Sequence, residues 1–195
     1  MLKVIMVVGV DEAGRGPLAG SVVSCALYIK ERIELPLKDS KSLSPCEREK
    51  FFEYFKYKTE FALGIATPQE IDEYNILNAT FISFERAIAS LIKKYSYLKD
   101  AVFIIDGNSF KTALPINYKC MEKADTKVKE VAYASIVAKL FRDYLMKIAD
   151  TIFPYWGFGK HKGYPTKEHY NCIETYSLSP LHRRSFLTYF YRQDE

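Results

Sequence analysis

The sequence predicts an α/β fold in which helices flank a mixed central sheet and a small helical, loop-rich appendage follows at the C-terminal end. Three observations lead to this prediction. Apolar runs typical of strands occur early, helix-forming segments lie between and after them, and glycine and proline interrupt the pattern beyond residue 153. The chain has 195 residues, of which 48% are hydrophobic, enough for a sizeable core. We expect residues 1–195 to form one domain, with residues 154–195 as a substrate-binding appendage.

Four apolar runs predict the strands of the sheet. They lie at residues 4–10, 22–29, 61–66 and 101–105. The first run is too short for a membrane span or for a secretory signal with its cleavage site, and an acidic pair interrupts the apolar pattern. It therefore predicts a buried strand in a cytoplasmic protein.

Capping signals predict where two of the helices begin. Ser44 and Pro45 are typical of an N-cap and a first helical position, and Thr-Pro-Gln-Glu at residues 67–70 forms a capping box. The other helical segments are expected at residues 79–95, 125–149 and 166–176. Since the second of these carries apolar residues around much of its circumference, we expect it to be buried against the sheet.

Charge and cysteine content narrow the classes of function. The formal net charge of +4 is a mild sign of a polyanionic partner. From Trp156 to Arg192, six Lys and Arg residues face only two acids, which fits either contact with nucleic acid or an ordinary solvated basic face. The cysteines form no CxxC pair and have no histidine at zinc-ligand spacing, so we expect reduced structural thiols. They are Cys25, Cys46, Cys120 and Cys172.

A short motif after the first predicted strand joins two carboxylates to a glycine-flanked arginine. Residues 10–17 read Val-Asp-Glu-Ala-Gly-Arg-Gly-Pro. Neighbouring side chains on a regular strand point to opposite faces, so Asp11 and Glu12 are expected to converge through a bend that the glycines permit. Carboxylates bind cations, whereas arginine and backbone amides bind phosphate. The motif suggests metal-assisted attack on a phosphodiester, and the alternative is a surface loop.

Two further aspartates stand where a site at a sheet edge would need them. Asp106 follows the fourth predicted strand, at a carboxyl end where the active sites of open sheets gather. Taken alone, it is more typical of a turn. Asp125 stands at the start of the predicted helix 125–149, where an aspartate can bind a metal or simply cap exposed amides.

Asp143 competes with Asp125 for the role of fourth acid because both lie on the same predicted helix. Eighteen helical residues at ~1.5 Å each would separate them by roughly 27 Å, too far for two ions about 4 Å apart. We favour Asp125 as the ligand, and expect Asp143 to pair with Lys139 or Arg142.

Eight ordered segments of the chain resemble the motifs of ribonuclease HII. They are DEAGRGPLAG (11–20), DSKSL (39–43), NILNAT (75–80), VFIIDG (102–107), KAD (123–125), ASIVAK (134–139), HKGYPT (161–166) and LHRRSF (181–186). Because they occur in order through nearly the whole chain, chance similarity is much less plausible than for a lone pattern. The resemblance implies a ribonuclease H-like fold.

The resemblance also assigns roles to individual residues. It makes Asp11, Glu12, Asp106 and Asp125 the catalytic, metal-binding acids, Gly14, Arg15 and Gly16 the ribonucleotide-sensing loop, and Tyr164 the junction-reading tyrosine. The acids would hold two divalent cations, Mg²⁺ or Mn²⁺. Pro165 stands where the family usually has a small residue, and it biases Tyr164 toward an extended backbone.

Polar residues elsewhere are candidates for contacts with the substrate, although each could equally be a solvated or capping group. They are Lys41, Asn75, Asn78, Lys162, Arg183 and Arg184. The histidines have neither a metal-ligand nor a serine-hydrolase context, so we assign them no catalytic role. They are His161, His169 and His182.

The implied function is an endoribonuclease that hydrolyses the RNA strand of RNA/DNA hybrids and incises 5′ of ribonucleotides embedded in duplex DNA. It would leave 5′-phosphate and 3′-hydroxyl ends and need no obligate protein partner. One alternative is a non-catalytic hybrid-binding module, which we would expect to lack a carboxylate. Another is a small-substrate metal hydrolase, which would not need the basic, aromatic tail beyond Trp156.

Overall fold

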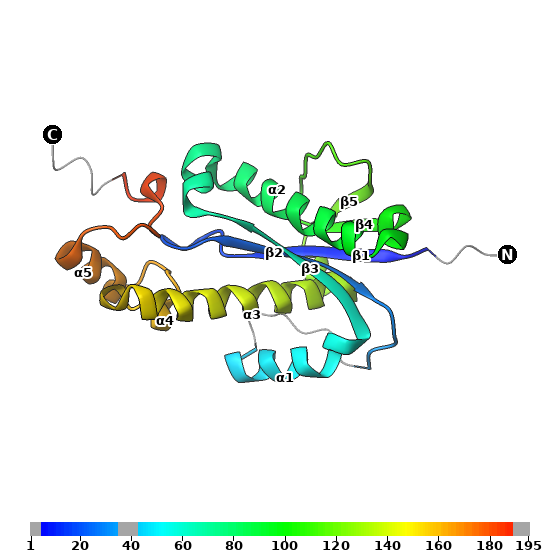
Figure 1. The fold of residues 1–195 in the computed structure, drawn as a ribbon, viewed down its shortest axis with the longest axis horizontal. Helices are drawn as coiled ribbons and strands as arrows, with labels where there is room; N and C mark the ends of the chain where they lie inside the picture. The colour runs from blue at the N-terminus through cyan, green and yellow to red at the C-terminus, as the bar shows by residue number, and fades with distance from the viewer. Residues whose placement is uncertain (1–4, 35–42, 189–195) are drawn as a thin grey trace.

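The computed structural model describes residues 5–34 and 43–188, which form a five-stranded sheet between helices (Figure 1). The strands are β1 (Val7–Ala13), β2 (Val22–Ile29), β3 (Thr59–Ala66), β4 (Val102–Asp106) and β5 (Asn117–Met121). Their spatial order is β3-β2-β1-β4-β5. β2 pairs antiparallel with β1 and β3, whereas β4 pairs parallel with β1 and β5. The predicted α/β class with a mixed sheet is therefore confirmed.

Helices cover both faces of the sheet, with α2 on one side and α3 and α1 on the other (Figure 1). The helices are α1 (Pro45–Phe55), α2 (Pro68–Lys94), α3 (Lys129–Ile152), α4 (Phe158–His161) and α5 (Lys167–Tyr176). Short 3-10 turns are η1 (Lys56–Lys58), η2 (Ser96–Asp100), η3 (Ala124–Thr126), η4 (Pro154–Trp156) and η5 (Arg184–Phe186). Within the described ranges, none of these helices combines the length and apolar character that a bilayer crossing requires.

Both predicted capping signals are confirmed. Ser44 caps α1 and Thr67 caps α2, each in a reciprocal box with the glutamate three residues later, Glu47 and Glu70. Each box satisfies amides that would otherwise lack partners at the start of the helix. Such a cap contributes roughly 1 kcal/mol, so these two starts are set locally by the sequence.

The two faces of the sheet bury separate apolar cores. Val8 and Val10 of β1 pack with α2 residues such as Phe84, whereas Leu27 of β2 packs with Tyr133 of α3. Alternation along β1 turns the residues between these valines toward α3. Gly9 permits the closest approach there, because a Cβ at this residue would lie 2.2 Å from the backbone of Glu130. The start of α3 is thereby brought against the strand that carries the two acids.

Several elements differ from the prediction in their bounds, and one strand was not predicted. β1 continues to Ala13 because β2 pairs with it through the acidic pair. α2 begins at Pro68, as the capping box predicts, and runs to Lys94 as one element that is interrupted at Asn75, whose backbone is non-helical. β5 was not predicted, since it is a mostly exposed strand at the edge of the sheet, where it pairs with β4. α3 begins at Lys129 rather than near residue 125, because the separate turn η3 precedes it.

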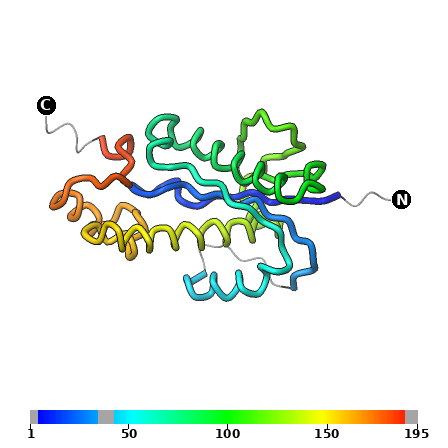
Figure 2. Tube along the Cα trace, viewed as in Figure 1, coloured from blue at the N-terminus to red at the C-terminus, as the bar shows by residue number. Residues whose placement is uncertain are grey.

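The segment after α3 folds back onto the loop between β1 and β2 (Figure 2). The Leu18 amide donates to the Gly163 carbonyl at 2.8 Å, and the Arg183 amide donates to the Leu18 carbonyl at 2.8 Å. The predicted helix in this region is confirmed as α5, which Thr166 caps. The loop after the acids is therefore enclosed by the C-terminal part of the chain.

The cysteines are free, but they do not all fit the expected structural role. Cys25 is buried in β2, whereas Cys46 is exposed at the start of α1. Packing thus explains the first thiol and not the second.

Candidate active site

The four predicted acids line one pocket of about 430 Å³. It lies at the carboxyl ends of β1 and β4 and is closed by the loop after β1, the turn η3, the α3 helix and the loop between α4 and α5. Its lining residues are Asp11, Glu12, Ala13, Gly14, Arg15, Gly16, Asp106, Asp125, Ser135, Lys139 and Tyr164. The four acids predicted from the sequence, Asp11, Glu12, Asp106 and Asp125, therefore line the same pocket.

Asp11 and Glu12 lie within regular β1, so the predicted bend between them is wrong. Asp11 pairs with Cys25 of β2 and Glu12 with Ser24, in unbroken register. Both still line the pocket, because they stand near the end of the strand. Asp11 is only 5% exposed. Its burial, and then the charges of Glu12 and Asp106, raise the pKa of the Asp11 carboxyl well above its usual value.

Strand register brings Asp106 beside Asp11. Val10 of β1 pairs with Ile105 of β4 in a parallel ladder, and the next residue of each strand is one of the two acids. The prediction that Asp106 ends a strand is confirmed. Its Oδ1 accepts a hydrogen bond of 2.7 Å from the Ala124 amide, which ties η3 to the end of β4.

Asp125 reaches the pocket from η3 and not from the long helix. Lys123 precedes this turn in the left-handed conformation, with φ 54°, and α3 starts only after Val128. The predicted position of Asp125 in the first turn of that helix is therefore wrong, and so is its assumed continuous helical path to Asp143. The turn is nevertheless positioned by the same strand end that carries Asp106.

Gly14 begins the loop that follows the acids, and its backbone has φ 105°. A Cβ there would lie 2.1 Å from Arg142 Nε, so this residue needs both the conformational freedom and the small size of glycine. Arg15 is exposed and its guanidinium lies 3.8 Å from Glu12 Oε1. The loop thus offers an arginine and backbone groups at the mouth of an acidic pocket.

Two buried arginines, Arg142 and Arg183, donate hydrogen bonds to backbone carbonyls of this loop. Arg142 donates to the carbonyls of Ala19 and Ser21, at 3.1 and 3.0 Å. Arg183 donates to the carbonyls of Gly14 and Arg15, at 2.6 and 2.9 Å. Because carbonyl oxygens occupy both guanidinium groups, these arginines order the backbone of the loop.

Tyr164 also lines the pocket and is 40% exposed. Its ring lies 5.7 Å from Lys139 Nζ and 5.8 Å from Arg142 Cζ, distances typical of cation–π contacts. The ring therefore stands on the same pocket as the four acids and faces two cations of α3.

Comparison with known proteins matches most of the chain to one family. The family profile described as ribonuclease HII matches residues 8–189. The chain belongs to the ribonuclease HII family. It is 45% identical to ribonuclease HII of Thermotoga maritima over 93% of this chain and 73% of that protein. It is 43% identical to ribonuclease HII of Clostridioides difficile over 92% of this chain and 69% of that protein.

A solved structure of ribonuclease H2 from Pyrococcus horikoshii has a similar fold, with a TM-score of 0.73, 26% sequence identity and 93% of each chain covered. The ribonuclease H-like fold and the family resemblance are thereby confirmed. As a ribonuclease HII, the chain is a hydrolase that acts on the RNA of RNA/DNA hybrids.

The structure corrects the predicted role of Arg183 in this ribonuclease HII. Its side chain is fully buried, with 0% exposure, so it does not present its charge to a phosphate. Burial, and then the neighbouring charge of Arg142, lower the pKa of Arg183 to about 9. The LHRRSF motif signalled a basic pair, but only the tertiary contacts show that the first arginine points inward.

The other candidate substrate contacts do not line the pocket. Asn75 has φ 65° and its side chain accepts from the amides of Leu77 and Asn78, so it caps the second part of α2. Asn78 and Arg184 are exposed, and Lys162 donates to the Gly159 carbonyl. Lys41 lies outside the described residues.

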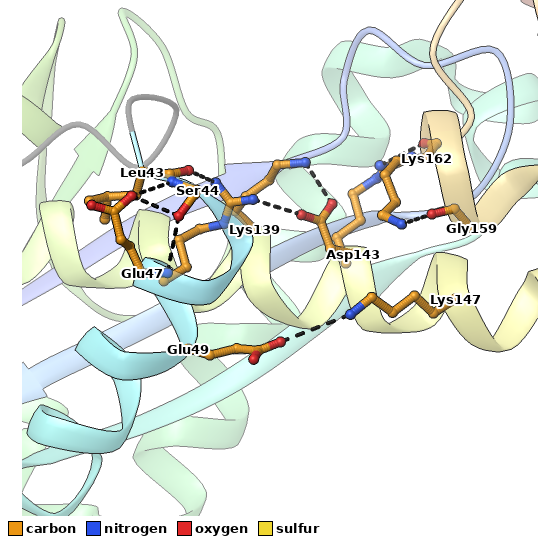
Figure 3. A network of polar contacts seen from close by, with 11 residues as sticks. Leu43, Ser44, Glu47, Glu49, Lys139, Asp143, Lys147, Gly159 and Lys162 are labelled. Atoms are coloured by element: carbon orange, nitrogen blue, oxygen red, sulfur yellow. Dashed lines mark hydrogen bonds and ion pairs between the residues drawn. The ribbon is translucent and has the colours of Figure 1, made fainter.

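Asp143 belongs to a neighbouring buried network (Figure 3). It accepts from Lys139 Nζ at 2.6 Å, as predicted, and from Arg48 NH2 at 3.1 Å. The alternative pairing with Arg142 is wrong, because Arg142 is engaged by carbonyl groups. Asp143 therefore positions Lys139, which reaches the acid pocket from the same helix.

Ser135 and Lys139 are pocket residues that the sequence analysis did not assign to the site. They stand four residues apart on α3, so they share one face of the helix. A hydrogen bond from Ser135 acts to lower the pKa of Asp11, against the larger effect of burial. The ASIVAK motif contains both residues, and their helical spacing next to a predicted acid site is the signal that identifies them.

Proposed function

We propose that the chain cuts at ribonucleotides paired with DNA, both in the RNA strand of hybrids and on the 5′ side of single ribonucleotides embedded in duplex DNA. The products would carry 5′-phosphate and 3′-hydroxyl ends. The observation that carries the proposal is the convergence of Asp11, Glu12, Asp106 and Asp125 on one pocket beside the loop at Gly14. A non-catalytic hybrid-binding module is not favoured, since no member of the acid set is missing.

The donor set fits two hard divalent cations, Mg²⁺ or Mn²⁺. All four acidic side chains in the pocket offer carboxylate oxygens, and the described residues that line it include no thiol or imidazole. These carboxylates do not form a compact ligand cluster among the described residues, so binding would draw them together. When bound, the ions would offset the mutual repulsion of the acids, activate a water molecule and stabilise the leaving 3′ oxygen.

The burial and contacts of the acids suggest how they would share the ions. Asp11 is the most buried of the four and faces both Glu12 and Asp106 electrostatically, so we assign it as the shared ligand. Asp106, fixed by the Ala124 amide, and Asp125, on the following turn, would complete the ligand set.

Recognition of the ribonucleotide would fall to the loop and the tyrosine. Gly16 has no atom within 4 Å of the position of a Cβ, so the backbone there is open to close approach by a sugar. We assign the 2′-hydroxyl, the group that separates RNA from DNA, to the backbone of Gly14, Arg15 and Gly16. Tyr164 would stack on the following sugar and favour an RNA-to-DNA step.

Other contacts are proposed on the outer surface. Asn78 and Arg184 are exposed polar groups suited to phosphate, and Lys41 and Asn75 remain candidates from the sequence. The enzyme would work in the cytoplasm without an obligate protein partner, and residues 154–195 would serve as a substrate-binding appendage of a single catalytic domain.

The test compares a duplex bearing one ribonucleotide with the same duplex made only of DNA. We expect cleavage of the first alone, on the 5′ side of the ribonucleotide, with Mg²⁺ or Mn²⁺ and not after chelation. A long RNA/DNA hybrid serves as the second substrate. Equal cutting of the all-DNA duplex, or full activity in chelator, would overturn the proposal.

A further inference from the structure

Three buried histidines lie beneath the backbone of Tyr164, outside the lining of the acid pocket. His161, His169 and His182 are 8%, 0% and 3% exposed. The rings of His161 and His169 stack with centroids 4.2 Å apart, and those of His169 and His182 lie 5.1 Å apart. The proposed mechanism uses none of them, yet His169 and His182 are joined by a hydrogen bond between their Nε2 atoms, whereas His161 stacks on His169 and bonds to backbone groups.

A backbone amide sets the proton position at the start of this series. The Ser179 amide lies 2.8 Å from His182 Nδ1, and an amide N–H can only donate. His182 Nδ1 must therefore accept, which places the proton of the neutral ring on Nε2. His182 Nε2 lies 3.0 Å from His169 Nε2 and donates to it.

The same reasoning carries the series to Tyr164. Since His169 Nε2 accepts, the proton of its neutral ring stands on Nδ1, which lies 3.0 Å from the Tyr164 carbonyl oxygen and donates to it. On the other side, the Gly163 amide donates to His161 Nδ1 at 3.1 Å. His161 Nε2 therefore carries a proton and donates to the Trp156 carbonyl at 2.7 Å.

We propose that His169 and His182 are positioning residues that fix the Tyr164 carbonyl, and through it the orientation of the Tyr164 ring over the acid pocket. The proposal rests on the proposed function only for the substrate contact of Tyr164. The geometry supports it because the backbone of Tyr164 is held from both sides, by His169 at its carbonyl and by the His161 carbonyl at its amide, at 3.0 Å.

Two donors hold the Tyr164 carbonyl directly before Pro165. The Thr166 amide, two residues along the chain, donates to the Tyr164 carbonyl at 2.8 Å. His169 adds a second donor from α5. All three imidazoles are suited to neutral donor and acceptor roles, since burial lowers their pKa, to about 4 for His169 and His182.

Packing alone is the competing explanation, because Phe158 contacts all three rings. A purely packed cluster needs ring volume, whereas a positioning series needs one defined tautomer at each ring. Nitrogen NMR of protein labelled in its histidines separates the two explanations without reference to activity. We expect the Nδ1–H form for His169 and the Nε2–H form for His182 and His161. The opposite form at His169 or His182 would overturn the proposal, even if the enzyme were active.

Two variants of His169 test the link to Tyr164. In His169→Asn the side-chain amide nitrogen stands near the place of Nδ1 and can still donate to the Tyr164 carbonyl. In His169→Gln the side-chain amide stands near the place of Nε2, so this variant keeps only the hydrogen bond to His182. On a single-ribonucleotide duplex we expect His169→Gln to lower kcat/KM about tenfold and His169→Asn by less than about threefold. Equal losses that follow the fall in melting temperature would indicate packing and overturn the proposal.

A double-mutant cycle completes the test. If His169 acts through Tyr164, His169→Gln should lower kcat/KM by less than about twofold in a Tyr164→Ala background, because the group it positions is already absent. If the fold-losses in kcat/KM of the two single variants instead multiplied in the double variant, the proposal would be overturned. If the wild-type chain cut neither a hybrid nor a single-ribonucleotide duplex, the proposed function would fail, whereas the tautomers would still decide whether the histidine series exists.

Discussion

Gly14 and Arg142 are in contact so close that no other residue fits at position 14, since a Cβ there would lie 2.1 Å from Arg142 Nε. Arg142 cannot easily withdraw, because it donates to the carbonyls of Ala19, Ser21 and Lys162. The loop beside the acids, the long helix and the tail therefore meet at one buried guanidinium. This junction sets the shape of the loop that is proposed to sense the ribose.

Gly14→Ala should destabilise the fold by roughly 2–5 kcal/mol, because the positive φ and the clash with Arg142 act together. Urea unfolding followed by circular dichroism measures this loss. Gly16→Ala is the matched control, since a Cβ at Gly16 meets nothing within 4 Å. Unfolding free energies that are equal in the two variants would contradict the close contact.

Asp11→Asn should abolish cleavage and leave the protein at least as stable in chelator at neutral pH. The raised pKa of Asp11 means that its ionised form is disfavoured in the folded state, so a neutral amide removes that cost. Activity on a hybrid and the melting temperature are measured together. Asp100 is exposed, so Asp100→Asn serves as the control and should change neither the activity nor the melting temperature. Normal turnover by Asp11→Asn would remove this residue from the mechanism.

Tyr164→Ala should impair cleavage of single-ribonucleotide duplexes more than cleavage of long hybrids, because only the former depend on one RNA-to-DNA junction. The ratio of kcat/KM between the two substrates is the measurement. Tyr164→Phe keeps the ring and should keep the ratio near that of the wild type. Similar losses on both substrates would point instead to general binding or packing.

Asp143→Ala should cost roughly 3–5 kcal/mol of unfolding free energy, because it leaves the buried Arg48 charge without its carboxylate. The side chains of this pair are only 6% and 9% exposed. Glu49→Ala offers a contrast on the same helices, since its pair with Lys147 is 3.9 Å long and more than half exposed, and its loss should cost at most about 1 kcal/mol. Chemical denaturation compares the two variants, and similar costs would contradict the burial argument.

Stability should fall as the pH drops from about 6.5, the ordinary histidine value, to about 4, the pKa of His169 and His182 in the folded chain. In this interval the unfolded state binds protons that the folded state does not, so acid favours unfolding. Asp11 acts in the opposite direction because its pKa is raised. The measurement is therefore the difference in unfolding free energy between wild type and His182→Gln. This difference should shrink as the pH falls. A difference that stays constant would contradict a lowered pKa for His182 in the folded chain.

Much of the architecture follows from local chemistry. The caps at Ser44 and Thr67, the strand at residues 22–29 and the helix after Thr166 were predicted from short-range patterns, and the structure confirms them. Backbone amides at helix starts and alternating apolar side chains require particular residues within a few positions, so such elements are visible in the sequence.

Other features had no local signal. The edge strand β5 is mostly exposed and depends on β4, while η3 depends on the bond from the Ala124 amide to Asp106. Arg183 looked like a surface cation, because its sequence neighbours do not reveal the carbonyl groups that surround it. Nothing in the spacing of His161, His169 and His182 indicates which nitrogen faces which.

By itself, the sequence determined the α/β class and the family, and it predicted the four acids and the tyrosine as site residues, because these depend on ordered motifs and on residue chemistry. Only the tertiary structure decided that Asp11 and Glu12 stay in a regular strand, that Arg183 turns inward, and that histidines hold Tyr164. The physical reason is that the direction of a side chain and the partner of a buried polar group depend on segments distant in the chain, such as Gly14 and Arg183, which are 169 positions apart.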